Sequence, residues 1–181
     1  AKAGTSNWVN GFTILANQLQ NSVNGTEIIW NVTDLDDGAY NLRAKVVCPS
    51  GIVYSERVSG IIDRMAPALL GRPQPANDIF IRGNEIAATY NEALDCSSMD
   101  SSKFTITKLS DGSIISGRIG CFENRLVITP IQDISAMIDD SFRIVLRNMP
   151  DRYGNKRTIE DLWGFVVKSA TPAVGALALN L

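Results

Sequence analysis

The sequence of 181 residues contains no histidine. This absence removes the commonest general base, the usual zinc ligand and every Ser-His-Asp or Cys-His arrangement. Most hydrolase mechanisms are thereby excluded, and no nucleophile motif stands out elsewhere in the chain. We therefore expect a protein that is not an enzyme and that uses no cofactor.

The chain also lacks a strong net charge, because 17 basic residues nearly cancel 19 acidic ones. The two signs stay balanced both before and after Ala66, which argues against nucleic acid or an anionic membrane surface as the main partner. Apolar runs are short, and none is long enough to span a bilayer. We expect neither nucleic-acid binding nor membrane insertion.

The amino terminus, residues 1–6, has no initiator Met and no signal-peptide hydrophobic core. This beginning indicates a mature product or an excised piece of a larger protein, and we favour the excised piece. Neighbouring domains of the same parent chain would then be its first partners.

Short apolar runs separated by turn residues every ten or so positions, without a long helical period, predict an all-β protein. In the clearest strand, residues 40–48, apolar and polar side chains alternate, so one face should be buried. Pro49-Ser50-Gly51 should turn this strand into an antiparallel partner over residues 52–62. Glu27 to Val32 is a further expected strand. The side chains expected on the buried face are Tyr40, Leu42, Ala44, Val46 and Cys48.

Residues 61–67 divide the chain, and Pro67 restricts Ala66 to extended geometry. We expect one domain over residues 1–66, incomplete at its N-terminus, a second over residues 67–168, and a tail or linker over residues 169–181. So short a connection predicts restricted motion between the domains. The side chains expected to point inward in the second domain are Phe104, Ile106, Leu126, Ile128, Phe142, Ile144 and Leu146, with one short helical turn within residues 133–139.

Short motifs in both halves of the chain carry a family resemblance. In the second half they are Asn84 to Leu94, Phe104-Thr105-Ile106, Asp111-Gly112, Asn124 to Pro130, Phe142 to Leu146, Asp151 to Asn155, and Phe165. Together they resemble the bacterial Ig-like domain family of S-layer and large surface proteins over residues 67–167, with Phe142 where that family usually has Tyr. The first half resembles a different Ig-like repeat, found in tandem on secreted bacterial proteins, and Asp36 to Tyr40 resembles the tyrosine corner that enters strand F.

The resemblance implies two consecutive immunoglobulin-like β-sandwiches with non-catalytic work: spacing, adhesion or presentation at a cell surface. It implies an extracellular or cell-surface location and a protein or glycan ligand, and it names none. An accessory carbohydrate-binding module of an extracellular enzyme is the alternative. For that alternative the candidate aromatic platform consists of Trp8, Trp30, Tyr54, Tyr153 and Trp163.

With this surface-protein interpretation, an oxidising compartment favours a disulfide between Cys96 and Cys121, which flank the hairpin over residues 104–119. It would close a loop of about 25 residues; the alternative is two unpaired small apolar side chains. Cys48 shares the inward face of its strand. A buried inert thiol and a disulfide with a cysteine outside this chain remain the two interpretations.

Acidic side chains suggest two further hypotheses. Calcium prefers six to eight oxygen ligands, and the candidate ligands are Asp34, Asp36, Asp37 and Asp63, with Asp151 and Asn155 as a second set. A solvated acidic turn and ordinary turn chemistry, with Gly154 at positive φ, are the respective alternatives. The pairs Glu92 with Asp95 and Asp139 with Asp140 are the candidates for a glycosidase dyad, which the absence of a cleft-forming pattern disfavours.

Overall fold

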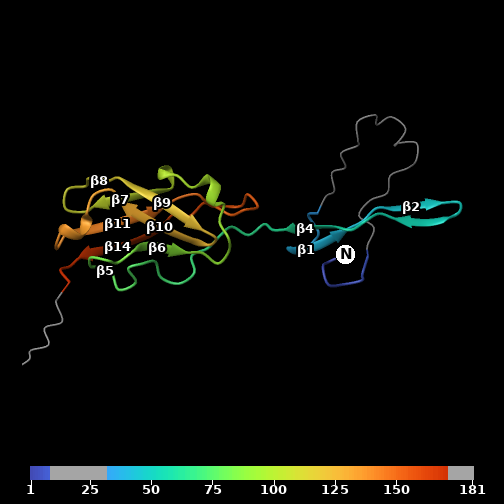
Figure 1. Cartoon of the computed structure of the whole chain (residues 1–181), viewed down its shortest axis with the longest axis horizontal. Helices are drawn as coiled ribbons and strands as arrows, with labels where there is room; N and C mark the ends of the chain where they lie inside the picture. The colour runs from blue at the N-terminus through green and yellow to red at the C-terminus, as the bar shows by residue number, and fades with distance from the viewer. Residues whose placement is uncertain (9–31, 171–181) are drawn as a thin grey trace, which may run out of the picture. The chain divides into compact units, whose positions relative to one another are not determined.

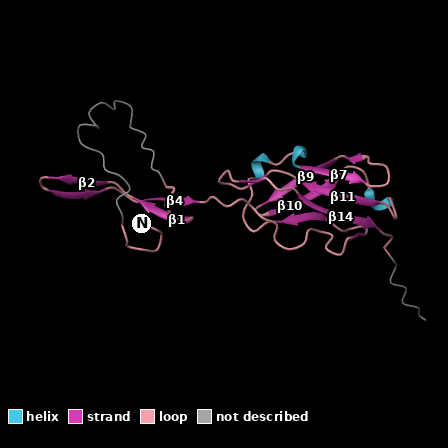
Figure 2. Ribbon diagram, turned by 180° about the vertical axis from the view of Figure 1, so that it is seen from behind, coloured by secondary structure: helices cyan, strands magenta, loops and turns pink. Residues whose placement is uncertain are grey.

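The computed structural model describes residues 1–8 and 32–170 (Figure 1). The strand expected from Glu27 to Val32 lies almost entirely outside these residues, as do Trp30 and residues 171–181. The described residues form strands and three short 3-10 turns, with no α-helix among them (Figure 2). The predicted all-β class is confirmed.

The chain separates into two compact units between Arg64 and Met65, whereas the sequence predicts a division between Ala66 and Pro67. In unit 1, β1 (Gly38–Leu42) pairs antiparallel with β4 (Val58–Ile62), and β2 (Lys45–Cys48) pairs antiparallel with β3 (Gly51–Tyr54). These four strands make up the long hairpin expected over residues 40–62.

A bulge interrupts this hairpin and splits each expected strand into two. Two residues, Arg43 and Ala44, lie between β1 and β2, while the three residues 55–57 lie between β3 and β4. The Ser55 N–H donates to the Ala44 carbonyl at 3.0 Å, and the Ala44 N–H donates to Ser55 Oγ at 2.8 Å. One extra residue on one strand bends a hairpin and increases its local twist.

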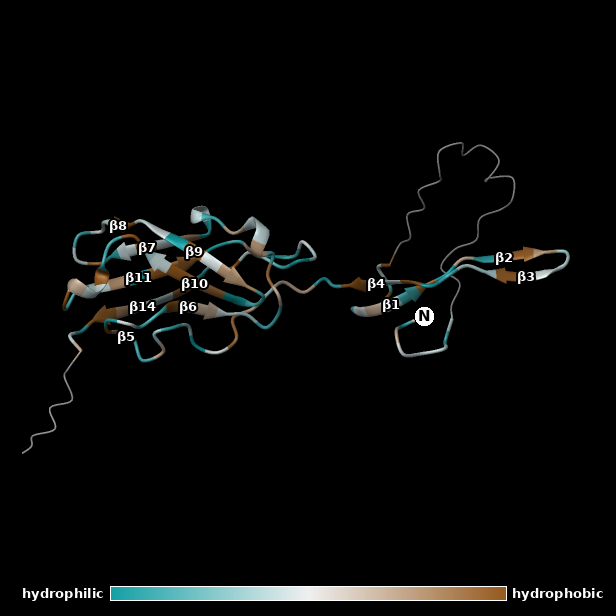
Figure 3. Cartoon of the chain, viewed as in Figure 1, coloured by the Kyte–Doolittle hydropathy of each residue, from teal (hydrophilic) through white to brown (hydrophobic). Residues whose placement is uncertain are grey.

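The predicted buried face of unit 1 is largely exposed. Tyr40 is buried at 8% exposure, but Leu42 is 41% and Val46 54% exposed; Ala44 is exposed and Cys48 half-buried. The expectation is wrong for these positions. An alternating pattern shows which face of a strand is apolar, but it does not provide the second layer of residues that would bury that face. In the described part of unit 1, residues 1–3 provide the only further strand-like pairing with the hairpin, through a bridge between Lys2 and Tyr40. Figure 3 shows the hydrophobic colouring along β3 and β4.

Unit 2 contains two larger sheets. The three-stranded sheet has the order β6 (Ile86–Thr89), β10 (Arg125–Pro130), β9 (Gly117–Phe122). The five-stranded sheet has the order β5 (Ile79–Phe80), β14 (Asp161–Val167), β11 (Ser141–Leu146), β7 (Phe104–Lys108), β8 (Ile114–Ile115). All pairings are antiparallel except that of β5 with β14.

Shorter elements connect these strands. They are η1 (Cys96–Ser98), η2 (Ser101–Lys103), η3 (Ile134–Ala136), β12 (Met149–Pro150) and β13 (Lys156–Arg157), the last two forming a small antiparallel pair. The turn η3 lies inside residues 133–139, where the sequence predicts one. Before β5, Leu69 bridges to Tyr90 and Gln74 bridges to Ala87, along the edge of β6 that does not pair with β10.

The two sheets of unit 2 contribute to one hydrophobic cluster. All seven side chains predicted to point inward are at most 7% exposed, so this part of the sequence prediction is confirmed. Phe165 stacks on Phe80 at a centroid distance of 5.2 Å and on Phe142 at 5.7 Å. Each fully buried side chain of this size stabilises the fold by roughly 1.5–3 kcal/mol through removal of apolar area from water.

Candidate functional site

The predicted disulfide is present. Cys96 in η1 and Cys121 in the edge strand β9 are bonded, with their Cα atoms 5.3 Å apart. The bond joins the segment that follows β6 to the opposite edge of the same sheet. Closing a 25-residue loop stabilises a fold by about 3 kcal/mol in the chain-entropy model.

Cys48 has a free thiol and is half-buried, at the β2 position opposite Gly51. The sequence predicts a buried side chain here. The thiol is more accessible than expected because no described element covers this part of the hairpin.

Arg64 forms hydrogen bonds with the acidic turn that the sequence suggests as a calcium site. Arg64 Nη1 pairs with Asp37 Oδ1 at 2.7 Å and also donates to the Leu35 carbonyl at 2.8 Å. Its Nη2 donates to the Val32 carbonyl at 2.6 Å. Within the described residues Asp34, Asp36 and Asp37 do not converge as three ligands on one point. The guanidinium thus binds one carboxylate and two backbone carbonyls of this turn, and calcium binding by these residues with Asp63 stays a prediction.

The second acidic set forms a closed turn. Asp151 is 1% exposed. Its Oδ1 accepts from the backbone N–H groups of Tyr153 at 2.8 Å and Asn155 at 2.9 Å, and its Oδ2 accepts from Asn155 Nδ2 at 2.7 Å. Gly154 has φ of 95°, as the sequence predicts. These hydrogen bonds compensate for the burial of the carboxylate and fix the conformation of the loop between β12 and β13.

The carboxylates suggested as a glycosidase dyad have other partners. Asp139 pairs with Lys168 at 2.7 Å, and Asp140 pairs with Lys108 at 2.9 Å. Asp95 Oδ1 accepts from the N–H and the hydroxyl of Ser97 at 3.1 and 2.5 Å. Asp95, Asp139 and Asp140 are thus each engaged by a neighbouring side chain or backbone group.

A buried polar contact that sequence reasoning missed links the two sheets. Tyr90, which follows β6 and is fully buried, donates its hydroxyl to Asp161 Oδ2 at 2.7 Å. Asp161 begins β14, is 3% exposed and pairs with Arg157 at 2.7 Å. Burial, followed by the hydrogen bond to Asp161, raises the pKa of Tyr90 well above its ordinary value of 10.0. Only the pair Arg157 and Asp161, four residues apart, was visible in the sequence.

Four aspartates with a serine two residues later form a second feature that was missed. In each, a carboxylate oxygen accepts from the backbone N–H of that serine, and three of them begin the 3-10 turns. Hydrogen bonds from the serine hold the pKa of each carboxyl below its usual value. The recurring Asp-x-Ser pattern was the available signal. The pairs are Asp95 with Ser97, Asp100 with Ser102, Asp111 with Ser113, and Asp133 with Ser135.

Comparison with known proteins gives a short result. No family model and no curated protein matches this chain. In the part of the chain that the structure describes, no helix combines the length and the apolar character needed to cross a membrane.

The aromatic residues proposed as a glycan platform are only partly brought together. Trp8 and Tyr54 both stack on the Arg43 guanidinium, at 3.8 and 4.0 Å from the ring centroids. Trp163 packs against the core of unit 2 and donates its indole N–H to the Gln74 carbonyl at 3.1 Å, while Tyr153 is 48% exposed. The Arg43 guanidinium therefore covers one face of the Trp8 ring and one face of the Tyr54 ring.

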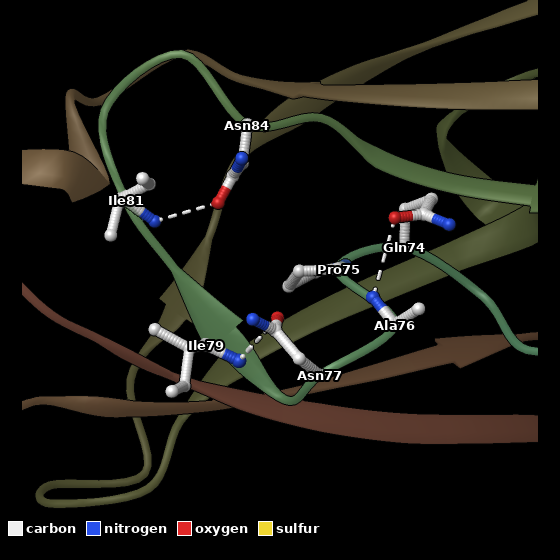
Figure 4. Close-up of a pocket in the computed structure, with 7 residues that line it drawn as sticks. All are labelled: Gln74, Pro75, Ala76, Asn77, Ile79, Ile81 and Asn84. Carbon is white, nitrogen blue, oxygen red and sulfur yellow. Dashed lines mark hydrogen bonds between the residues drawn. The ribbon is translucent and has the colours of Figure 1, made fainter.

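Two hollows among the described residues of unit 2 are open and shallow. One, of about 330 Å³, lies in the loop from Gln74 to Asn84 (Figure 4). There Asn84 Oδ1 accepts from the Ile81 N–H at 2.9 Å and Asn77 Oδ1 from the Ile79 N–H at 3.3 Å. The second, of about 410 Å³, lies between the loop at Arg82 and the residues from Pro130 to Ser135. The amide side chains of the first hollow shape the loop. Asp133 and Ser135 line the second hollow, and there the Ser135 hydroxyl donates to Asp133 Oδ1 at 2.5 Å as part of the turn η3.

Proposed function

We propose that this chain is a non-catalytic structural and interaction module of a larger secreted or cell-surface protein, built from consecutive immunoglobulin-like β-sandwiches. Its work would be spacing, adhesion or presentation. The observation that carries the proposal is the strand order of unit 2.

Immunoglobulin domains place strands A, B, E and D in one sheet and G, F, C and C′ in the other. In unit 2, residues 69–74 lie along β6, which is followed across the sheet by β10 and β9. The other sheet runs β14, β11, β7, β8 after the short β5. When β5, β12 and β13 are left unlettered and the other segments are lettered in chain order, from residues 69–74 as A through β14 as G, the order of strands in both sheets agrees with that of immunoglobulin domains and supports the proposed fold. The shared core between them supports a sandwich.

The hydrogen bond of Tyr40 supports the same assignment for unit 1. Its hydroxyl donates to the Asp36 carbonyl at 2.9 Å, four residues upstream, as a tyrosine corner does at the start of strand F. On this assignment β1 is strand F and β4 is strand G.

The disulfide supports the secreted or surface location. Structural disulfides form and persist mainly in oxidising compartments, and that between Cys96 and Cys121 ties a turn to a sheet edge without lining a pocket. The buried ionisable groups Tyr90, Asp151 and Asp161 are each satisfied by protein partners. This pattern is typical of groups that organise a fold rather than groups poised for proton transfer.

Intact cells that produce the parent protein provide the test. We expect an antibody against residues 67–168 to label intact cells or the culture medium, and a non-reducing peptide map of that material to contain the Cys96–Cys121 linkage. Material found only inside cells with both thiols reduced would refute the proposal. A hydrolase screen of the purified chain should give no turnover, and its glycan-array signal should not depend on Trp8 or Tyr54.

A further inference from the structure

The last hairpins of the two units are built alike. Each follows an Asp-Asp pair, at residues 36–37 and 139–140. Each has a base of two antiparallel strands, β1 with β4 and β11 with β14, and a tip of two shorter strands, β2 with β3 and β12 with β13. Unit 2 therefore shows which strands pack against a hairpin of this kind when it is part of a larger sheet.

In unit 2 the outer edge of the last strand is occupied. The strand β5 runs parallel to β14, with Val166 opposite Ile79. The Val166 N–H donates to the Asp78 carbonyl at 2.9 Å, and the Lys168 N–H donates to the Phe80 carbonyl at 2.8 Å. Two outward N–H groups, two residues apart, are thus satisfied by carbonyls of β5 and of the residue before it.

The corresponding edge in unit 1 is the outer edge of β4. The backbone hydrogen bonds of β1 show which groups of β4 point toward it. The Asn41 N–H donates to the Ala1 carbonyl and the Ala3 N–H to the Ala39 carbonyl, both at 2.8 Å. Residues 39 and 41 therefore face the N-terminal segment, and Tyr40 faces its partner Gly60 in β4. Because backbone direction alternates along a strand, Ser59 and Ile61 turn their N–H and carbonyl groups away from β1.

No backbone bond to these groups of Ser59 and Ile61 exists among the described residues. The side chains beside this edge are apolar as well as exposed: Val58 is 65%, Ile61 55% and Leu42 41% exposed. The equivalent hairpin in unit 2 buries Phe142 and Phe165 at 0% and 4%. An open strand edge next to exposed apolar side chains is a template for pairing with a further strand.

We propose that the outer edge of β4 binds a short, extended, apolar strand of a partner polypeptide, parallel to β4, as β14 binds β5. Ser59 and Ile61 would donate their N–H groups to its carbonyls, and Val58 and Leu42 would pack against its side chains. This inference deepens the proposed interaction role and rests on it, because it names the chemistry of the partner.

The test uses the full chain and a synthetic peptide with the sequence of residues 76–84, the segment that contains β5. On adding the peptide we expect the amides of Ser59 and Ile61 to exchange with solvent about tenfold more slowly, which corresponds to about 1.4 kcal/mol of added protection. The Gly60 amide, already bonded to β1, should not change. A peptide with proline in place of Phe80 should not bind.

Two variants at one position give a matched comparison. Ser59→Ala and Ser59→Pro both lose the hydroxyl that donates to Asn41 Oδ1, but only the proline removes the outward N–H, and an outward-facing edge position tolerates proline. We expect Ser59→Ala to bind the peptide within about twofold of the original chain and Ser59→Pro at least about tenfold more weakly. Unchanged far-ultraviolet circular dichroism would show that both variants are folded.

Three results would overturn the inference: no binding at millimolar peptide, equal binding by the two variants, or protection of Ser59 and Ile61 that rises with protein concentration without peptide. The last result would assign this edge to a second copy of the chain. If the peptide fails to bind while the parent protein is still found on the cell surface, strand binding is refuted and the spacer role is not.

Discussion

The same kind of hairpin is covered in one unit and bare in the other. In unit 2, β11 and β14 are flanked by β7 and β5, and a second sheet contributes to the same core. In unit 1, β1 is flanked by residues 1–3, and Tyr40 is the one buried large apolar side chain among the described residues. The difference teaches that an alternating strand specifies which face is apolar, while the cover for that face comes from elements elsewhere in the chain or in a partner.

The largest test of this comparison removes a covered side chain. Phe142→Ala empties a fully buried position between the two sheets of unit 2 and should lower the free energy of unfolding by about 3–5 kcal/mol. Chemical denaturation followed by circular dichroism measures the loss. A change below about 1 kcal/mol would mean that the core is not packed as described.

Removing the disulfide should have the next largest effect. A double substitution of Cys96 and Cys121 by serine should cost about 3 kcal/mol, because the unfolded chain regains the freedom that the closed loop denied it. The loss should appear in denaturation of the variant and, to a similar extent, in the original chain under reducing conditions. A chain equally stable with and without reductant would contradict a stabilising role.

The contact of Tyr90 with Asp161 should have a smaller effect that depends on pH. Tyr90→Phe removes one buried hydrogen bond to a charged group, for a loss of about 1.5–3 kcal/mol at neutral pH. Because burial and Asp161 raise the pKa of Tyr90 in the folded state above its ordinary 10.0, the unfolded state loses this proton first. The original chain should therefore lose stability as the pH rises above about 10, and Tyr90→Phe should lose less over the same range.

The smallest effect on stability is expected in unit 1, where the hairpin is largely uncovered. Leu42→Ala in β1 changes a side chain that is 41% exposed, so it should alter unfolding of the isolated chain by about 0.5 kcal/mol or less. The same variant should weaken binding of the residue 76–84 peptide. A loss as large as that of Phe142→Ala would show that unit 1 already has a complete core.

The sequence was sufficient for the class, the long hairpin of unit 1 and the inward positions of unit 2, because alternation, turn residues and apolar runs act over a few neighbouring residues. It was insufficient to predict how exposed Leu42 and Val46 are, because burial of a strand face depends on a second layer of residues packed against it. The link between Tyr90 and Asp161 joins residues 71 positions apart, and no local pattern announces such a pair. The bulge at residues 55–57 was also missed. One extra residue reverses the alternation of a strand, but the polar run over residues 55–57 hides this reversal.

The disulfide also has a topological consequence. The exposed turn at residues 109–113 lies inside the loop that Cys96 and Cys121 close. A protease that cut the backbone once in this turn would leave the two fragments covalently joined, each still holding strands of the shared core. The module would keep its attachment to both ends of the parent chain after such a nick, and the damage would become visible on a gel only after reduction.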